Sequence, residues 1–233
     1  MAEENKPGFF SRLVQESRDW YVYLKYKLFE YDEEEPQSEP EEPVKEPVSE
    51  PDDNKTDEDK TIGIDDLIKM ALDGNVEAQL NLGCCYYAGD GVRQSFDAAV
   101  KWFRKAAEQG DAVAQYNLGE CYAEGSGVEQ NFEISAEWFL KAAEQGYDNA
   151  QNNLGNCYYQ GIGVEKNPET AVEWYKKAAE QGLSYAQYNL AGCYFNGEGV
   201  EPDKEKAFYY MKLAADQGYD EAQKFLDEVE KDG

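Results

Sequence analysis

Apolar and small residues recur along residues 61–233 with helical spacing, and the whole pattern repeats every 36 residues. In the first half of each unit an alanine is followed by a leucine and then a tyrosine at intervals of four, as in Ala114, Leu118 and Tyr122. Residues four apart lie on one face of a helix. The stripe stops at a Gly-x-Gly-Val turn, where glycine permits the positive φ that ends helices. Each unit therefore begins with one predicted helix.

The second half of each unit predicts another helix. It opens at residues that favour helix N-caps, namely Ser95, Asn131, Asn167 and Asp203. An aromatic and alanine face follows, as in Trp138, Phe139 and Ala142. Two helices in a period of this length indicate a solenoid. We therefore expect an all-α fold, a right-handed α-solenoid with complete units at 75–110, 111–146, 147–182 and 183–218 and half-unit caps at 65–74 and 219–230.

The recurring motif A-x-Y-N-L-G-x-C-Y-x-x-G-x-G-V, followed by W-[FY]-x-K-A-A-E-Q-G, resembles the Sel-one-like repeat, a relative of the tetratricopeptide repeat. The resemblance covers residues 61–233. It implies a non-catalytic scaffold that presents a surface to protein partners. By analogy with tetratricopeptide arrays, the first helices would line a concave groove.

The amino-terminal third has a different composition. Residues 32–60 hold fourteen acids, three bases and five prolines, which predicts a disordered acidic linker. Residues 1–31 form an aromatic segment with Phe10, Leu13, Tyr21 and Leu24 on one approximate helical face. Three interpretations stay open: docking onto the solenoid or a second copy of the chain, binding a partner protein as a helix, or contacting a membrane surface through residues 8–31.

Charge and composition narrow the function classes. A net charge of -27 and a pI near 4.2 repel phosphate backbones, so they argue against nucleic acid and favour a basic protein partner. The chain has no histidine, which removes the usual general base and metal ligand. The Gly-x-Gly pairs follow helices rather than strands, which argues against a dinucleotide loop. We therefore expect no enzyme, no cofactor and no metal. The absence of a basic leader and of a long apolar run predicts a cytoplasmic protein.

Cysteines and paired acids are interpreted as structural. Four cysteines share one repeat position, at Cys85, Cys121, Cys157 and Cys193. Packed helices lie about 8–10 Å apart, too far for a zinc site or a disulfide. We expect these thiols to be buried small hydrophobic groups, with Cys84 alone accessible. Glu120 and Glu124 are expected to be ordinary helix-surface residues.

Several first-helix positions vary between units and form the candidate partner surface. They are Leu80, Tyr116, Asn152 and Tyr188 at one position, Tyr87, Tyr159 and Phe195 at another, and Tyr185. Their aromatic content suits a peptide or a protein edge, although packing between repeats would also explain it. If these side chains form a partner surface, Tyr116→Ala costs under about 1 kcal/mol of stability, whereas Trp138→Ala costs about 3–5 kcal/mol.

Asparagine recurs directly before the core leucine, at Asn81, Asn117, Asn153 and Asn189. Asparagine is a weak helix former, so another role must hold it there. One interpretation is that each amide bonds a backbone group of its own or the adjacent unit. The other is a ladder of donors and acceptors for the backbone of an extended peptide. Two functions therefore remain: a scaffold that binds a protein or peptide in the groove, or a tethering protein whose amino-terminal helix binds a partner.

Overall fold

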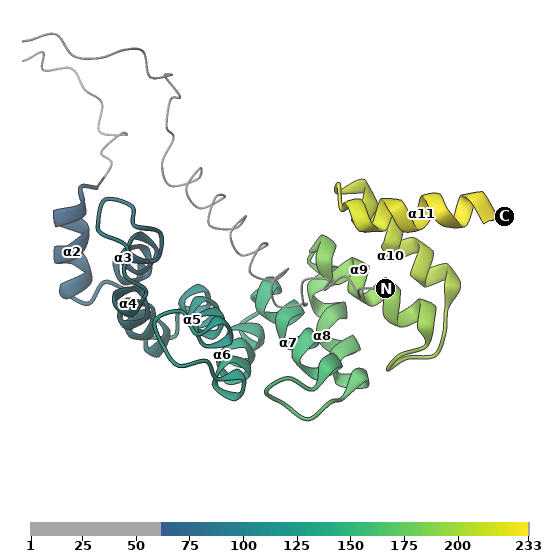
Figure 1. Cartoon of the computed structure of the whole chain (residues 1–233), viewed down its shortest axis with the longest axis horizontal. Coiled ribbons are helices and arrows are strands. Elements are labelled where there is room, and N and C mark those ends of the chain that lie inside the picture. The colour runs from purple at the N-terminus through teal and green to yellow at the C-terminus, as the bar shows by residue number, and fades with distance from the viewer. Residues whose placement is uncertain (1–61, 233) are drawn as a thin grey trace, which may run out of the picture. The chain divides into compact units, whose positions relative to one another are not determined.

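The computed structural model describes residues 62–232, and every regular element in that range is a helix. First helices of the units are α3 (Val76–Ala88), α5 (Ala112–Glu124), α7 (Asp148–Gln160) and α9 (Ser184–Asn196). Second helices are α4 (Phe96–Glu108), α6 (Phe132–Glu144), α8 (Pro168–Glu180) and α10 (Lys204–Asp216). Single helices precede and follow them, α2 (Ile64–Leu72) and α11 (Asp220–Asp232). The all-α prediction of tandem helix pairs is confirmed (Figure 1).

The predictions for the linker and for the aromatic amino-terminal segment fall on residues outside the described range. Contacts divide the chain into Met1–Asp66 and Leu67–Gly233, and the repeats all belong to the second unit. Within that unit each helix from α3 to α10 packs on the next along the chain. Among the helices of residues 62–232, none is long and apolar enough to span a bilayer.

Caps mark where the second helices begin and where the first helices end. The side chains of Ser95, Asn131, Asn167 and Asp203 accept hydrogen bonds from backbone N–H groups three residues on, as their residue types predicted. The first helices end on a glycine with positive φ, for example Gly125 at 76°. Its N–H donates to the carbonyl of Cys121, which closes the last turn. Gly127, the second glycine of this turn, lies so close to Phe96 that a Cβ would overlap the Phe96 backbone.

Each unit is built around one fully buried leucine, at Leu82, Leu118, Leu154 and Leu190. The first and second helices of each unit also approach each other closely. A Cβ on Gly119 would lie 2.7 Å from two ring atoms of Phe139, and Gly83 and Gly155 face Phe103 and Tyr175 in the same way. The fourth unit has Ala191 at this position, and the residue that takes the place of the ring is Met211. A flexible thioether leaves room for the extra methyl group.

In each unit one glutamine bonds the helix before the unit, and a second glutamine bonds the first. In the second unit Gln115 donates from Nε2 to the carbonyl oxygen of Ala107 at 3.1 Å, and Gln145 donates to Gln115 Oε1 at 2.7 Å. The same pair of bonds recurs at Gln79 and Gln109, at Gln151 and Gln181, and at Gln187 and Gln217. The first glutamine of each pair is buried, so these bonds satisfy its amide, whereas the second glutamine is exposed. We call this arrangement the glutamine clasp.

Candidate binding surface on the first helices

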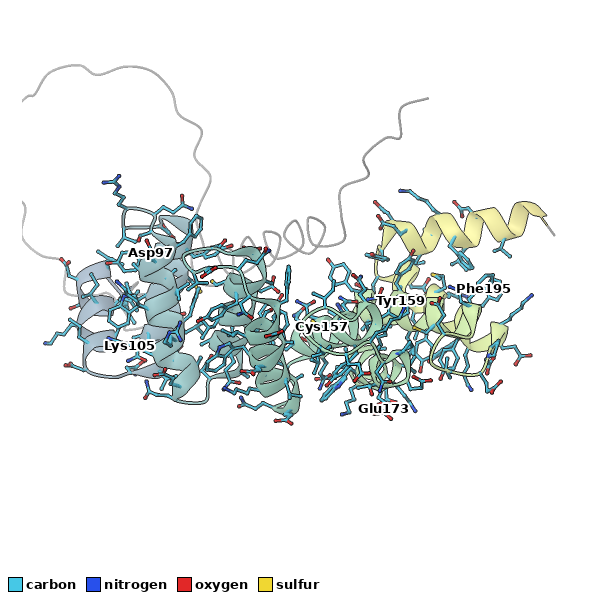
Figure 2. The ribbon with its side chains drawn as sticks, turned by 60° about the horizontal axis from the view of Figure 1, so that its bottom comes forward. Asp97, Lys105, Cys157, Tyr159, Glu173 and Phe195 are labelled. Atoms are coloured by element: carbon cyan, nitrogen blue, oxygen red, sulfur yellow. The ribbon has the colours of Figure 1, made fainter. Side chains whose placement is uncertain are left out.

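The candidate partner residues lie on the first helices α3, α5, α7 and α9, on the side of each helix that faces the neighbouring first helices. We call this surface the first-helix face. Figure 2 labels Tyr159 and Phe195, which belong to this face, and Glu173, which lies on a second helix at the opposite side of the ribbon. Hydrogen bonds between side chains join successive first helices, such as Asn153 to Glu120 at 2.9 Å and Tyr87 to Glu124 at 3.0 Å.

The first of the candidate positions, at residues 80, 116, 152 and 188, is divided between buried and partly exposed side chains. Leu80 and Tyr188 are half-buried, but Tyr116 and Asn152 are only 7% and 6% exposed. The expectation that both present free side chains to a partner therefore does not hold. The next unit contacts both side chains, through the Tyr147 ring at Tyr116 and through the Asn189 amide at Asn152.

Tyr116 illustrates the correction. Its ring lies 5.7 Å from that of Phe139 and 5.2 Å from that of Tyr147, which belongs to the following unit. Burial, and after it the negative charge of Glu120, holds the pKa of Tyr116 well above its usual value. Since Tyr116 lies in the core, its truncation is expected to cost about 3–5 kcal/mol rather than under 1 kcal/mol. Trp138, expected to be the costly core residue, is only half-buried and lies beneath Lys141.

A second set of aromatic side chains is accessible. Phe195 is 38% exposed, and Tyr87, Tyr159 and Tyr185 are half-buried. Two of them are held by hydrogen bonds, since the hydroxyl of Tyr87 donates to Glu124 and that of Tyr159 donates to Glu198. Tyr87 and Tyr159 are therefore partly accessible rings in fixed orientations, which suits recognition.

The recurring asparagines bond the adjacent unit where it offers acceptors. Asn153 donates to Glu120 Oε1 at 2.9 Å and to the Tyr116 hydroxyl at 3.5 Å. Asn189 donates to the Asn152 and Asn156 amide oxygens, at 3.0 and 3.4 Å. These bonds fit the structural interpretation, although the acceptors are side chains and not backbone groups as expected. The peptide-binding ladder stays a prediction.

Asn117 differs from Asn153 and Asn189. Its Nδ2 atom is buried and has no hydrogen-bond partner within the described part of the chain. Asn81 is half-buried, and no first helix precedes α3 within residues 62–232. The recurring asparagine is thus satisfied at two positions and unsatisfied at one.

The two acids of α5 are not ordinary surface residues, contrary to expectation. Glu120 is 8% exposed. Glu124 accepts hydrogen bonds at Oε2 from Tyr87 and Ser126, both at 3.0 Å, while its Oε1 is buried without a partner in residues 62–232. Asn117, Glu120 and Glu124 are spaced so that they lie on one helical face, and this spacing could have indicated a shared polar environment.

The cysteines behave as predicted for buried small side chains. Cys85, Cys121, Cys157 and Cys193 are buried and free of disulfides. Burial, followed by the charge of Glu120, raises the pKa of the Cys157 thiol to about 12. Cys84, expected to be accessible, is half-buried, and burial raises its pKa to about 12 as well. Such thiols are protonated and therefore weakly nucleophilic at neutral pH.

Comparison with known proteins extends this description. The family model of the Sel1 (Sel-one-like) repeat matches residues 76–111, 112–147, 148–183 and 184–219. A Sel1 repeat protein from Oxalobacter formigenes is 40% identical over 70% of this chain and 64% of its own, with a TM-score of 0.65. The protein c5321, a protective antigen of uropathogenic Escherichia coli strains with an SLR fold, is 28% identical over 93% of this chain and 50% of its own, with a TM-score of 0.53.

None of the curated proteins compared with the chain matches it. The chain covers less than two thirds of the length of either structural relative. In both relatives the similarity includes the helical repeats, and neither name specifies a binding partner.

Proposed function

Because this chain belongs to the Sel1 repeat family, whose members generally act as protein-interaction scaffolds, we propose that it is a non-catalytic scaffold that binds a protein or an extended peptide along its first-helix face. The observation that carries the proposal is the row of accessible aromatic edges on that face, at Tyr87, Tyr159 and Phe195. Their orientations are fixed by the repeat framework, so little side-chain entropy is lost on binding.

The chemistry of the chain supports a binding role. It contains no histidine, and burial raises the pKa values of its thiols, so it offers neither an imidazole base nor a reactive thiolate at neutral pH. Its net charge of -27 favours a basic partner over nucleic acid.

The proposal is tested by capturing partners from cell extract with the full chain and with variants. The double variant Tyr159→Ser and Phe195→Ser should reduce recovery of specific partners by about tenfold or more, because aromatic anchors carry much of an interface's affinity. Tyr209→Ser is the matched control. Tyr209 is 60% exposed on the second helix α10, more than Phe195, and its replacement should leave capture unchanged.

The opposite pattern would contradict the proposal: partners lost with Tyr209→Ser and retained with the double variant. Circular dichroism of each variant confirms that the helices are intact, so that a loss of capture reports on the surface and not on unfolding.

A further inference from the structure

Three buried polar atoms lack a hydrogen-bond partner within the described residues, and all belong to α5 or to the residue before α7. They are Asn117 Nδ2, Glu124 Oε1 and the Tyr147 hydroxyl. The first two belong to α5, and Tyr147 is the N-cap of α7, the next first helix. Unsatisfied buried polar groups are uncommon because each costs about 1–3 kcal/mol. Their concentration on the first-helix face indicates that something outside residues 62–232 satisfies them.

The repeat explains why Asn117 lacks an acceptor. Asn153 and Asn189 each donate to two positions of the preceding first helix, which lie 37 and 33 residues earlier. For Asn117 the equivalent positions are Leu80 and Cys84, and a leucine side chain offers no acceptor and a thiol only a weak one. The donor is therefore retained in a unit whose neighbour has lost the acceptors.

Asn117, Glu120 and Glu124 form a polar stripe along α5, at i, i+3 and i+7. The stripe spans about 10 Å at 1.5 Å per residue, which is close to the length of three extended peptide residues. At one end of the stripe the Asn117 amide lacks an acceptor, and at the other end the Glu124 Oε1 atom lacks a donor. Both are polar complements to an extended peptide.

Charge on the repeats is divided by helix. The four first helices α3, α5, α7 and α9 contain no lysine or arginine, whereas every second helix contains at least one. Several of these lysines lie over tryptophan rings of their own helix, as Lys141 does over Trp138 at 3.7 Å. The two ion pairs described for residues 62–232, Lys176 with Glu180 and Lys206 with Asp203, also involve second-helix lysines. The acids on α3, α5 and α7 thus have no cation on their own helix.

We propose that the polar stripe of α5 is a subsite for a lysine or arginine side chain of an extended peptide partner. The cation donates to Glu124 Oε1, Glu120 adds a second negative charge, and Asn117 Nδ2 donates to a peptide carbonyl. Hydrogen bonds between ionised groups in a partly buried site are stronger than neutral ones, so this contact selects the residue type at one peptide position. The inference rests on the proposed function and specifies the partner chemistry.

The test uses the full chain and a phage-displayed library of random 12-residue peptides. Peptides selected on the unmodified chain should share a lysine or arginine at one position. The dissociation constant of the tightest peptide should rise about tenfold or more with Glu124→Gln, which keeps an acceptor for Tyr87 but removes the charge. Glu173→Gln, an exposed second-helix change of the same chemistry, is the control and should have no effect.

A peptide variant with norleucine in place of the shared lysine completes a double-mutant cycle. The two changes should be non-additive, because each removes the same contact. Affinity of the unmodified pair should also fall as salt rises.

The outcomes separate this inference from the proposed function. Peptides that lose binding with Tyr159→Ser and Phe195→Ser, yet carry no shared cation and tolerate Glu124→Gln, would overturn the subsite and leave the scaffold proposal standing. Failure to select any peptide would also overturn the subsite and leave the scaffold proposal to the capture experiment, whereas peptides that ignore every first-helix change would overturn both.

Discussion

At the scale of single residues, helix packing in this chain depends on the pairing of a small residue with a ring. Gly119 has no Cβ, and the Phe139 ring occupies the space that a Cβ would need. The fourth unit contains a different solution, Ala191 with Met211, which shows that the position tolerates a methyl group when the opposing side chain is flexible.

Gly119→Ala is therefore expected to destabilise the chain by about 1–3 kcal/mol, because the new methyl overlaps Phe139. Chemical denaturation measures the loss. Adding Phe139→Met should recover part of it, as in the fourth unit. Gly192→Ala is the matched control, since a Cβ there meets nothing within 4 Å, and it should leave stability unchanged or higher. Equal destabilisation at both glycines would contradict the account.

Candidate site residues could be identified from sequence only in part. Variation between units marked both Phe195, which is accessible, and Tyr116, which is buried, because variation alone does not show which side chains the next unit covers. The environments of Glu120 and Glu124 were not predicted either. Charged residues are seldom buried, and these two side chains are enclosed through contacts between first helices.

At the scale of elements, the helix pairs could be predicted almost completely. Caps, glycine turns and apolar spacing are local signals, and they placed the second-helix N-caps correctly. The glutamine clasp was not predicted, because its bonds join residues 8 and 30 positions apart. Only the recurrence of glutamine in every unit marked it.

Gln115→Ala should cost about 1–3 kcal/mol of unfolding free energy, because it removes two hydrogen bonds and leaves the buried Ala107 carbonyl and the Gln145 amide without this partner. Gln223→Ala tests whether position alone matters. Gln223 occupies the equivalent place in α11 but is exposed and bonds Asp227 within its own helix, so its loss should cost under about 0.5 kcal/mol. Comparable losses at both sites would show that the clasp contributes little.

At the scale of the whole molecule, one buried thiol per unit makes stability depend on alkaline pH. Burial raises the pKa values of Cys157 and Cys193 from 9.0 to about 12. Folding therefore favours the neutral thiols. Their contribution is fully present below pH 9.0, the ordinary thiol pKa, and is lost as pH rises through the folded value.

The melting temperature should fall between about pH 9 and pH 12. Cys157→Ala should make that fall shallower than in the unmodified chain, with tyrosine ionisation common to both. Thermal melts monitored by circular dichroism across this range measure the difference. Identical pH profiles for the two proteins would show that the Cys157 thiol does not contribute to the alkaline loss.

The central claim for the whole molecule is that partners bind the first helices and not the second. A photoreactive phenylalanine analogue introduced at Phe195, or separately at Tyr209, tests it most directly with the tightest peptide or captured partner. We predict crosslinking from position 195 and little from position 209, although Tyr209 is the more exposed at 60% against 38%. Crosslinking from position 209 and none from position 195 would contradict the account.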